Sequence, residues 1–116
     1  MAKEVNTELK QSEPHIIVEI IEYVPDSVVS RTIIKKNTGT VTATSFDEGE
    51  ELAEKTSPFD NYVQIIDGVA DVEIDGIKHL LRLGEGIIIP AHHRHCFYAT
   101  QQFKMICTMI KSGYED

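Results

Sequence analysis

Short runs of apolar residues, broken at regular intervals by turn-forming residues, follow one another along most of the chain. In VADVEID the apolar residues Ala70, Val72 and Ile74 alternate with acidic residues, which is the period of a half-buried strand. Dipeptides such as Pro25-Asp26 close these runs. The pattern predicts strands over residues 15–21, 27–36, 39–46, 69–75, 95–100 and 103–111, with further short strands between 61 and 90.

One stretch, FDEGEELAEK over residues 46–55, has a composition that favours a helix. Its apolar residues Phe46, Leu52 and Ala53 do not recur at helical spacing, so we predict the end of a strand followed by a loop. Roughly eight or nine short strands with little or no helix predict an all-β fold, an antiparallel jelly roll or barrel.

Length and composition fit a single domain. With 116 residues, 41% of them hydrophobic, the chain can bury one core and is too short for two. Residues 1–14 are polar and carry mixed charge. We therefore predict a flexible N-terminal arm over residues 1–14, followed by one domain over residues 15–116.

The charge of the chain argues against several classes of partner. A net charge of −8 with scattered basic residues disfavours binding to nucleic acid or to an anionic membrane, because both need clustered Lys and Arg. No stretch reads as a membrane-spanning helix or a signal peptide, so we expect a cytoplasmic protein. Cys96 and Cys107 are too few for a disulfide framework, and we interpret them as small apolar residues of strands.

Two segments resemble the paired motifs of the cupin superfamily. GEELAEKTSPFDNYVQIIDG sets Gly49 and Gly68 at the ends of the first motif, and GEGIIIPAHHRHCFYA supplies Gly84, Pro90 and His95 of the second. The chain is similar to short single-domain cupins. This resemblance implies a double-stranded β-helix barrel that binds a small molecule in its mouth. It also implies a homodimer, to which residues 16–34 are expected to contribute.

In that family, three histidines and a glutamate hold a transition metal in the barrel mouth. Here the matching positions carry Lys55, Ser57, Asn61 and His95, and only the last is a good ligand. We therefore expect either no cofactor or a weakly bound divalent metal. If neighbouring residues replace the missing ligands, the candidates are His95, His93, His92 and Asp60, with Glu54 as a further acid. The two histidines of the preceding turn, His92 and His93, are expected at the rim.

The residues predicted to line the ligand pocket are His95, Lys55, Ser57, Asn61 and Phe97. His95 either bonds Asn61, Ser57 or water, or orients the ligand and transfers a proton. Lys55 either binds a carboxylate or phosphate, acts as a nucleophile or base, or reaches solvent and pairs with a nearby acid.

Three functions remain open from these residues, in the following order. The first is a small cupin that binds a small molecule, an anion among the options, without a tightly held transition metal. The second is a metal-dependent dioxygenase or isomerase with displaced ligands around His95. The third is a metal-free isomerase or lyase in which His95 and Lys55 transfer protons. Whether the protein is an enzyme is left open.

Overall fold

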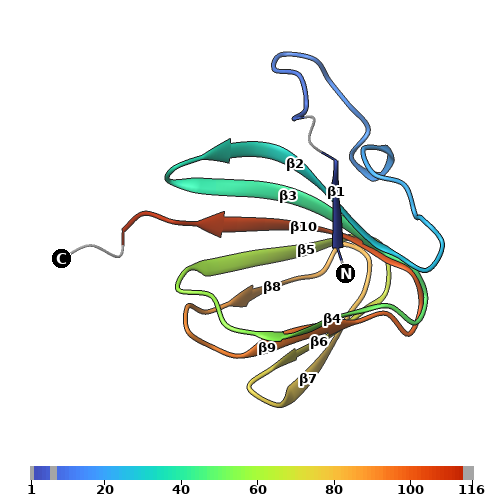
Figure 1. The fold of residues 1–116 in the computed structure, drawn as a ribbon, viewed down its shortest axis with the longest axis vertical. Coiled ribbons are helices and arrows are strands. Elements are labelled where there is room, and N and C mark those ends of the chain that lie inside the picture. The colour runs from blue at the N-terminus through green and yellow to red at the C-terminus, as the bar shows by residue number, and fades with distance from the viewer. Residues whose placement is uncertain (1, 6–7, 114–116) are drawn as a thin grey trace.

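The computed structural model describes residues 2–5 and 8–113 of the chain. Its strands form two sheets that face each other (Figure 1). The larger sheet has the order β1-β2-β3-β10-β5-β8, with bounds Ala2–Val5, Val28–Lys36, Gly39–Phe46, Phe103–Ile110, Asp60–Gly68 and Gly86–Ile89. The smaller sheet has the order β4-β9-β6-β7, with bounds Glu51–Lys55, His95–Tyr98, Ala70–Ile74 and Ile77–Leu81.

Strand pairs in both sheets are antiparallel except at one edge, where β1 and β2 pair in parallel. Among the described residues, helical structure is limited to one 3-10 turn, Ile17–Glu19. No helix in this part of the chain is long and apolar enough to cross a membrane. The predicted all-β fold, two antiparallel sheets with almost no helix, is confirmed.

The main apolar core lies between the two sheets. Phe46 at the end of β3 stacks on Phe103 at the start of β10, with ring centroids 4.4 Å apart. The alternation predicted for β6 is confirmed, because Ala70, Val72 and Ile74 are buried in this cluster. The core fills the end of the barrel at which β3 ends, and the opposite end is left for a cavity.

A second apolar cluster lies on the outer face of the larger sheet. Ile20 and Ile21, which precede β2, pack against Val29, Ala43 and Ile106 of three neighbouring strands. We call residues 16–24 the outer strap. Val41 and Ala43 of β3 point outward toward the strap, and Thr42 and Thr44, on the other face of the strand, line the barrel interior.

Polar side chains of the sheet also bind the strap. The bonds to strap carbonyls run from Lys104 Nζ to Val18 (2.7 Å), from Arg31 to Ile20 (2.9 Å) and from Ser45 Oγ to Glu22 (2.8 Å). In the other direction, the Tyr23 hydroxyl of the strap donates to the Asp67 carboxylate at 2.6 Å. Three backbone carbonyls of the strap are thus hydrogen-bonded without strand pairing.

The strand predicted over residues 15–21 is wrong, because this stretch makes a 3-10 turn. The amide of Glu19 donates to the carbonyl of Ile16 at 2.9 Å. Ile20 and Ile21 are adjacent yet both buried, whereas Ile16 and Ile17 are exposed. Burial therefore does not alternate as it would in a half-buried strand.

The loop predicted after Phe46 contains a strand, β4. It pairs with β9, with Glu51 opposite Tyr98 and Lys55 opposite His95. The partner strand lies far along the chain, so local composition gave no sign of the pairing. Residues 2–5 also form a strand, β1, within the predicted arm. The predicted flexibility of the arm stays a prediction.

Gly68, the last glycine of the first motif, has a structural reason to be glycine. Its φ is +72°, and a Cβ built on it would lie 2.1 Å from the backbone oxygen of Gln102. No side chain fits between these backbones. Gly68 thereby allows the end of β5 to approach the start of β10.

Candidate functional site

A cavity of about 520 Å³ lies between the two sheets, bounded by residues near the ends of β4 and β10. Much of its wall is apolar: Leu52, Ile89, Phe97, Met105 and Met109. Hydroxyl groups of β2 and β3 form part of one side: Ser30, Thr42 and Thr44. The volume is within the range of small-molecule sites, which is roughly 300–1,000 Å³.

The structure brings all the residues predicted for the ligand pocket to this one cavity: His95, Lys55, Ser57, Asn61 and Phe97. They come from both sheets and from the loop between β4 and β5. His95 and Phe97 lie on the same face of β9, with ring centroids 5.9 Å apart in an edge-to-face arrangement. Matching the sequence to the two cupin motifs, position by position, was therefore sufficient to locate the cavity.

A β-bulge on β4 determines which charge faces the cavity. Leu52 is opposite Phe97 and Lys55 is opposite His95, so the step on β4 is one residue longer than the step on β9. The extra residue keeps Leu52 and Lys55 on the same, inner face. In a regular strand this face would receive Glu54 instead.

His95 is buried, with 4% of its surface exposed. Its Nδ1 bonds the backbone carbonyl of His93 at 3.3 Å, a partner that the sequence did not indicate, and the predicted bond to Asn61, Ser57 or water stays a prediction. A carbonyl only accepts, so Nδ1 carries the proton and the lone pair of the neutral ring is on Nε2. Burial lowers the pKa of His95; the His93 carbonyl opposes this shift and the Lys55 ammonium adds to it.

Asn61 and Ser57 bind the protein's own loop and strands. The Asn61 side chain donates to the carbonyl of Phe59 at 3.2 Å and accepts from the Cys107 thiol at 3.4 Å. The Ser57 hydroxyl accepts from the amide of Phe59 at 3.2 Å. Burial raises the pKa of Cys107 to about 11, with the Lys55 ammonium opposing the shift, so the thiol is neutral.

The remaining metal candidates lie at the rim, and the side chains of His93 and Asp60 bond other groups of the protein. His93 Nδ1 bonds the Asp75 carboxylate, and this bond holds the pKa of Asp75 below its ordinary value. His92 is exposed and its amide donates to the carbonyl of Ser57 at 2.7 Å. Asp60 accepts from the amide of Ala91 at 2.8 Å. These contacts fasten the turn before β9 to its neighbours.

The residues present do not fit the family's metal. Of the four family positions, Lys55, Ser57 and Asn61 replace strong ligands, and His95 alone offers an imidazole. Across residues 2–5 and 8–113, no group of three or more His, Cys, Asp and Glu side chains is placed to hold a metal ion.

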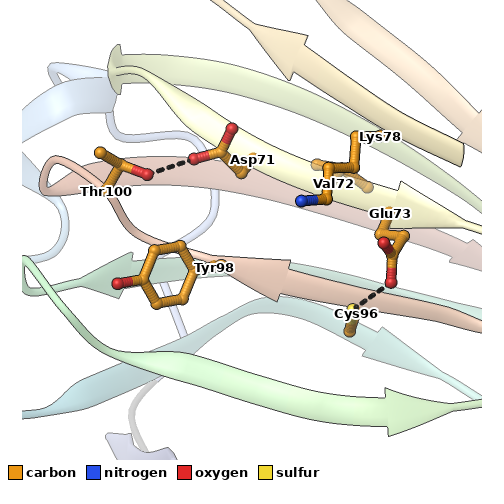
Figure 2. Close-up of a pocket in the computed structure, with 7 residues that line it drawn as sticks. All are labelled: Asp71, Val72, Glu73, Lys78, Cys96, Tyr98 and Thr100. Atoms are coloured by element: carbon orange, nitrogen blue, oxygen red, sulfur yellow. Dashed lines mark hydrogen bonds between the residues drawn. The ribbon is translucent and has the colours of Figure 1, made fainter. Parts of the chain in front are cut away.

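A second hollow, of about 430 Å³, lies on the outer face of the smaller sheet (Figure 2). Cys96 and Tyr98 point into it, away from the barrel interior, as the alternation of β9 predicts. Its polar groups bond one another: Thr100 donates to Asp71 at 2.6 Å, and the Cys96 thiol donates to Glu73 at 3.6 Å. Burial and the nearby carboxylates raise the pKa of Cys96.

Several lining residues were not predicted as site residues. The alternation in GTVTATSF indicated one face for Thr42 and Thr44 but not that this face is the interior. Met105, Cys107 and Met109 alternate along β10 and so lie on one face, and the structure brings this face to the cavity. Lys111 also lines the cavity, and no pattern in the sequence indicated it.

Comparisons with known proteins give fold neighbours and a short sequence match. No family model matches the chain. Protein SchB of Streptomyces halstedii is 36% identical over 53 residues, which are 45% of this chain and 38% of SchB. The chain thus matches well under half of the length of this curated relative.

Solved structures are similar over most of the chain. A conserved protein of unknown function from Streptococcus pyogenes has a TM-score of 0.86 and 26% identity, covering 92% of this chain and 94% of its own. A cupin superfamily protein from Desulfitobacterium hafniense DCB-2 has a TM-score of 0.85 and 24% identity, covering 93% and 99%. A cupin 2 conserved barrel domain protein from Leptotrichia buccalis has a TM-score of 0.79 and 30% identity, covering 81% and 46%.

Proposed function

Because this chain is a short member of the cupin superfamily, we propose that it binds a small organic molecule in the cavity between its two sheets, without a tightly held transition metal. The observation that carries the proposal is the exchange of ligands at the family's metal positions. A cation, a hydroxyl and an amide stand there in place of strong ligands, yet the cavity around them is kept.

The form of the cavity supports a ligand larger than a metal ion. Its wall combines apolar side chains such as Phe97 and Met105 with a few polar groups such as His95 and Lys55. Small-molecule sites have this composition, because apolar surface supplies affinity and a few polar groups fix orientation. Cupin folds carry many different functions, so the argument rests on the site and not on the fold.

Metal analysis of the purified, untagged protein tests the metal part of the proposal. We expect far less than one equivalent of Fe, Mn, Ni, Cu or Zn after dialysis, and no gain in thermal stability on adding these ions. Near one equivalent that survives dialysis and is lost in His95→Ala would show a metal-dependent cupin with displaced ligands instead. His79→Ala, outside the cavity, is the matched control.

A fragment screen read by 15N–1H NMR tests the ligand part. We expect binders to shift amides around the cavity, such as those of His95 and Cys107, and to leave amides around the outer hollow unchanged. Binders that shift only the outer hollow, or no binders at all, would contradict the proposal.

A second candidate function is metal-free proton transfer, and it rests on the tautomer of His95. The bond from Nδ1 to the His93 carbonyl leaves Nε2 as the nitrogen that can accept a proton. The Lys55 ammonium is close enough to influence its pKa. For any substrate found, turnover that is lost in His95→Asn and reduced in Lys55→Ala supports this function, and equal turnover in the variants excludes it.

A further inference from the structure

We propose that the ligand of this cavity is an organic carboxylate with an apolar body, whose carboxylate group is bound at the rim by Lys55 and Lys111. This inference rests on the proposed function and deepens it. The arguments come from the charge of the lining, the register of β4, and the different chemistry of the rim and the interior.

The lining of the cavity is positive although the chain is strongly acidic. The whole sequence has a net charge of −8. Among the described residues, Lys55 and Lys111 line the cavity and no Asp or Glu does so. The absence of carboxylates from the described lining of this cavity favours an anion there, because like charges would weaken its binding.

The bulge on β4 provides one of these cations. It aims Lys55 inward, whereas Glu54 lies outside and faces Arg94, with 3.9 Å between the carboxylate oxygen and the guanidinium nitrogen. Removing one residue from the bulge would exchange a lysine for a glutamate at the cavity. The register of this strand therefore sets the sign of the charge at the site.

Lys55 is available to a ligand. Within residues 8–113 it makes no salt bridge, and its side chain is exposed at the mouth. Its charge lowers the pKa of both His95 and Cys107, so the ammonium lies near two groups of the wall. Lys111 is positioned by its backbone, whose amide donates to the carbonyl of Thr38 at 2.8 Å.

The interior of the cavity suits an apolar body. Phe97, Met105 and Ile89 are almost fully buried there. The hydroxyls of Ser30 and Thr44 bond each other at 3.0 Å, which uses one of their two protons. Polar groups of a ligand placed against these apolar side chains would lose hydrogen bonds to water without replacing them.

Charges elsewhere on the barrel are arranged to steer an anion toward this mouth. The strand ends around the mouth carry Lys35, Lys36, Lys55, Arg94 and Lys111. The opposite strand ends carry Asp26, Asp47, Glu48, Glu50, Asp67 and Glu85, with Arg82 and the buried Lys104 as the bases there. Among the described residues, the acids near the mouth are engaged: Glu54 by Arg94, Asp75 by His93, Asp60 by the amide of Ala91 and Glu8 by the amide of Lys35. Such separation raises the rate of association with an anion.

Three probes of matched shape, with acetate as a fourth, test the inference by 15N–1H NMR titration of the full chain. They are 3-phenylpropionate, 3-phenylpropan-1-ol, 3-phenylpropylamine and acetate. We expect 3-phenylpropionate to shift the amides around His95 and Cys107 and to bind about tenfold more tightly than the alcohol, as one charge pair in a half-open site predicts. Acetate, which lacks the apolar body, should bind more weakly, and the amine should not bind.

Single substitutions test which lysine binds the carboxylate of the probe. Lys55→Met should weaken the binding of 3-phenylpropionate about tenfold, and Lys55→Arg should preserve most of it. Lys78→Met is the control, because it changes the net charge equally but lies at the outer hollow (Figure 2). Lys111→Met provides a second, independent measurement at the rim.

The outcomes separate this inference from the proposed function. If the alcohol binds in the cavity as tightly as the carboxylate, or if Lys55→Met behaves like Lys78→Met, the inference is wrong and the proposed function stands. If none of the four probes shifts the cavity amides but the fragment screen finds binders there, the inference is wrong and the proposed function stands. If neither the probes nor the screen shifts these amides, the proposed function fails as well.

Discussion

Replacing Lys104 by Met tests how the outer strap is held on the sheet. Lys104 is only 8% exposed, its Nζ donates to the carbonyl of Val18 at 2.7 Å, and it lies 4.8 Å from the centroid of the Tyr23 ring. Met keeps most of the apolar length of the side chain and removes the ammonium. The change therefore isolates the charged contacts from the packing.

The expected cost follows from three contributions. A hydrogen bond from a charged donor contributes about 1.5–3 kcal/mol, and a shielded cation–π contact contributes up to about 2 kcal/mol. The variant no longer buries a charge, which offsets part of this loss. We expect a net loss of about 1–3 kcal/mol in the free energy of unfolding, a large share of the roughly 5–15 kcal/mol typical of a domain.

Urea unfolding and hydrogen exchange measure the effect. The midpoint should fall by about 1 M, given a slope of about 2 kcal/mol per M. Exchange should accelerate over the strap more than over β5. Lys36→Met, at an exposed strand end, is the control and should stay within about 0.5 kcal/mol of the natural chain. A midpoint for Lys104→Met equal to that of Lys36→Met would refute the reasoning.

Four further predictions concern single groups and assembly. Because burial lowers the pKa of His95 below 6.5, its contribution to stability is complete above about pH 6.5 and is lost as the pH falls through the folded-state pKa. The urea midpoint of His95→Asn should therefore fall less between pH 7 and 5 than that of the natural chain, and equal slopes contradict this. With its pKa raised to about 11, Cys107 should resist iodoacetamide at pH 8 until urea unfolds the protein; peptide mapping that finds it alkylated in the folded state counts against the burial argument. Gly68→Ala should destabilise the fold by several kcal/mol, well beyond the roughly 1–2 kcal/mol of backbone strain expected at Gly76→Ala, where a Cβ meets open space; equal losses exclude a steric cause. The predicted homodimer through residues 16–34, where Ile16 and Ile34 are exposed, should sediment at twice the 13.1 kDa of the chain, and a monomer contradicts it.

The sequence by itself determined the fold and the position of the cavity. Alternation in segments such as 70–74 reports burial on one face directly, because side chains of a strand point to opposite faces in turn. Gly68 could be recognised in the sequence as the last glycine of the first motif. The structure gives the reason for it, because no other residue fits its backbone contact. The loss of metal ligands could also be read there, since Lys55, Ser57 and Asn61 are chemically unsuited wherever they point.

Tertiary structure decided the local features that depend on distant strands. The strand β4 exists because β9 pairs with it, and residues 16–21 are not a strand because they cover the outer face of the sheet. His95 bonds the carbonyl of His93, a contact that residue types alone do not specify. A single-sequence pattern carries information on neighbours along the chain, and pairing partners far apart in sequence are outside its reach.

The charge of the cavity is the clearest case of a property that tertiary structure decided. Glu54 and Lys55 are adjacent in the sequence, and in a regular strand the inward position would carry the acid. One extra residue in the pairing of β4 with β9 turns the lysine inward. A single bulge reverses which side chains of a strand face inward. The sequence therefore determined the residue types, and the strand register determined the sign of the charge at the cavity.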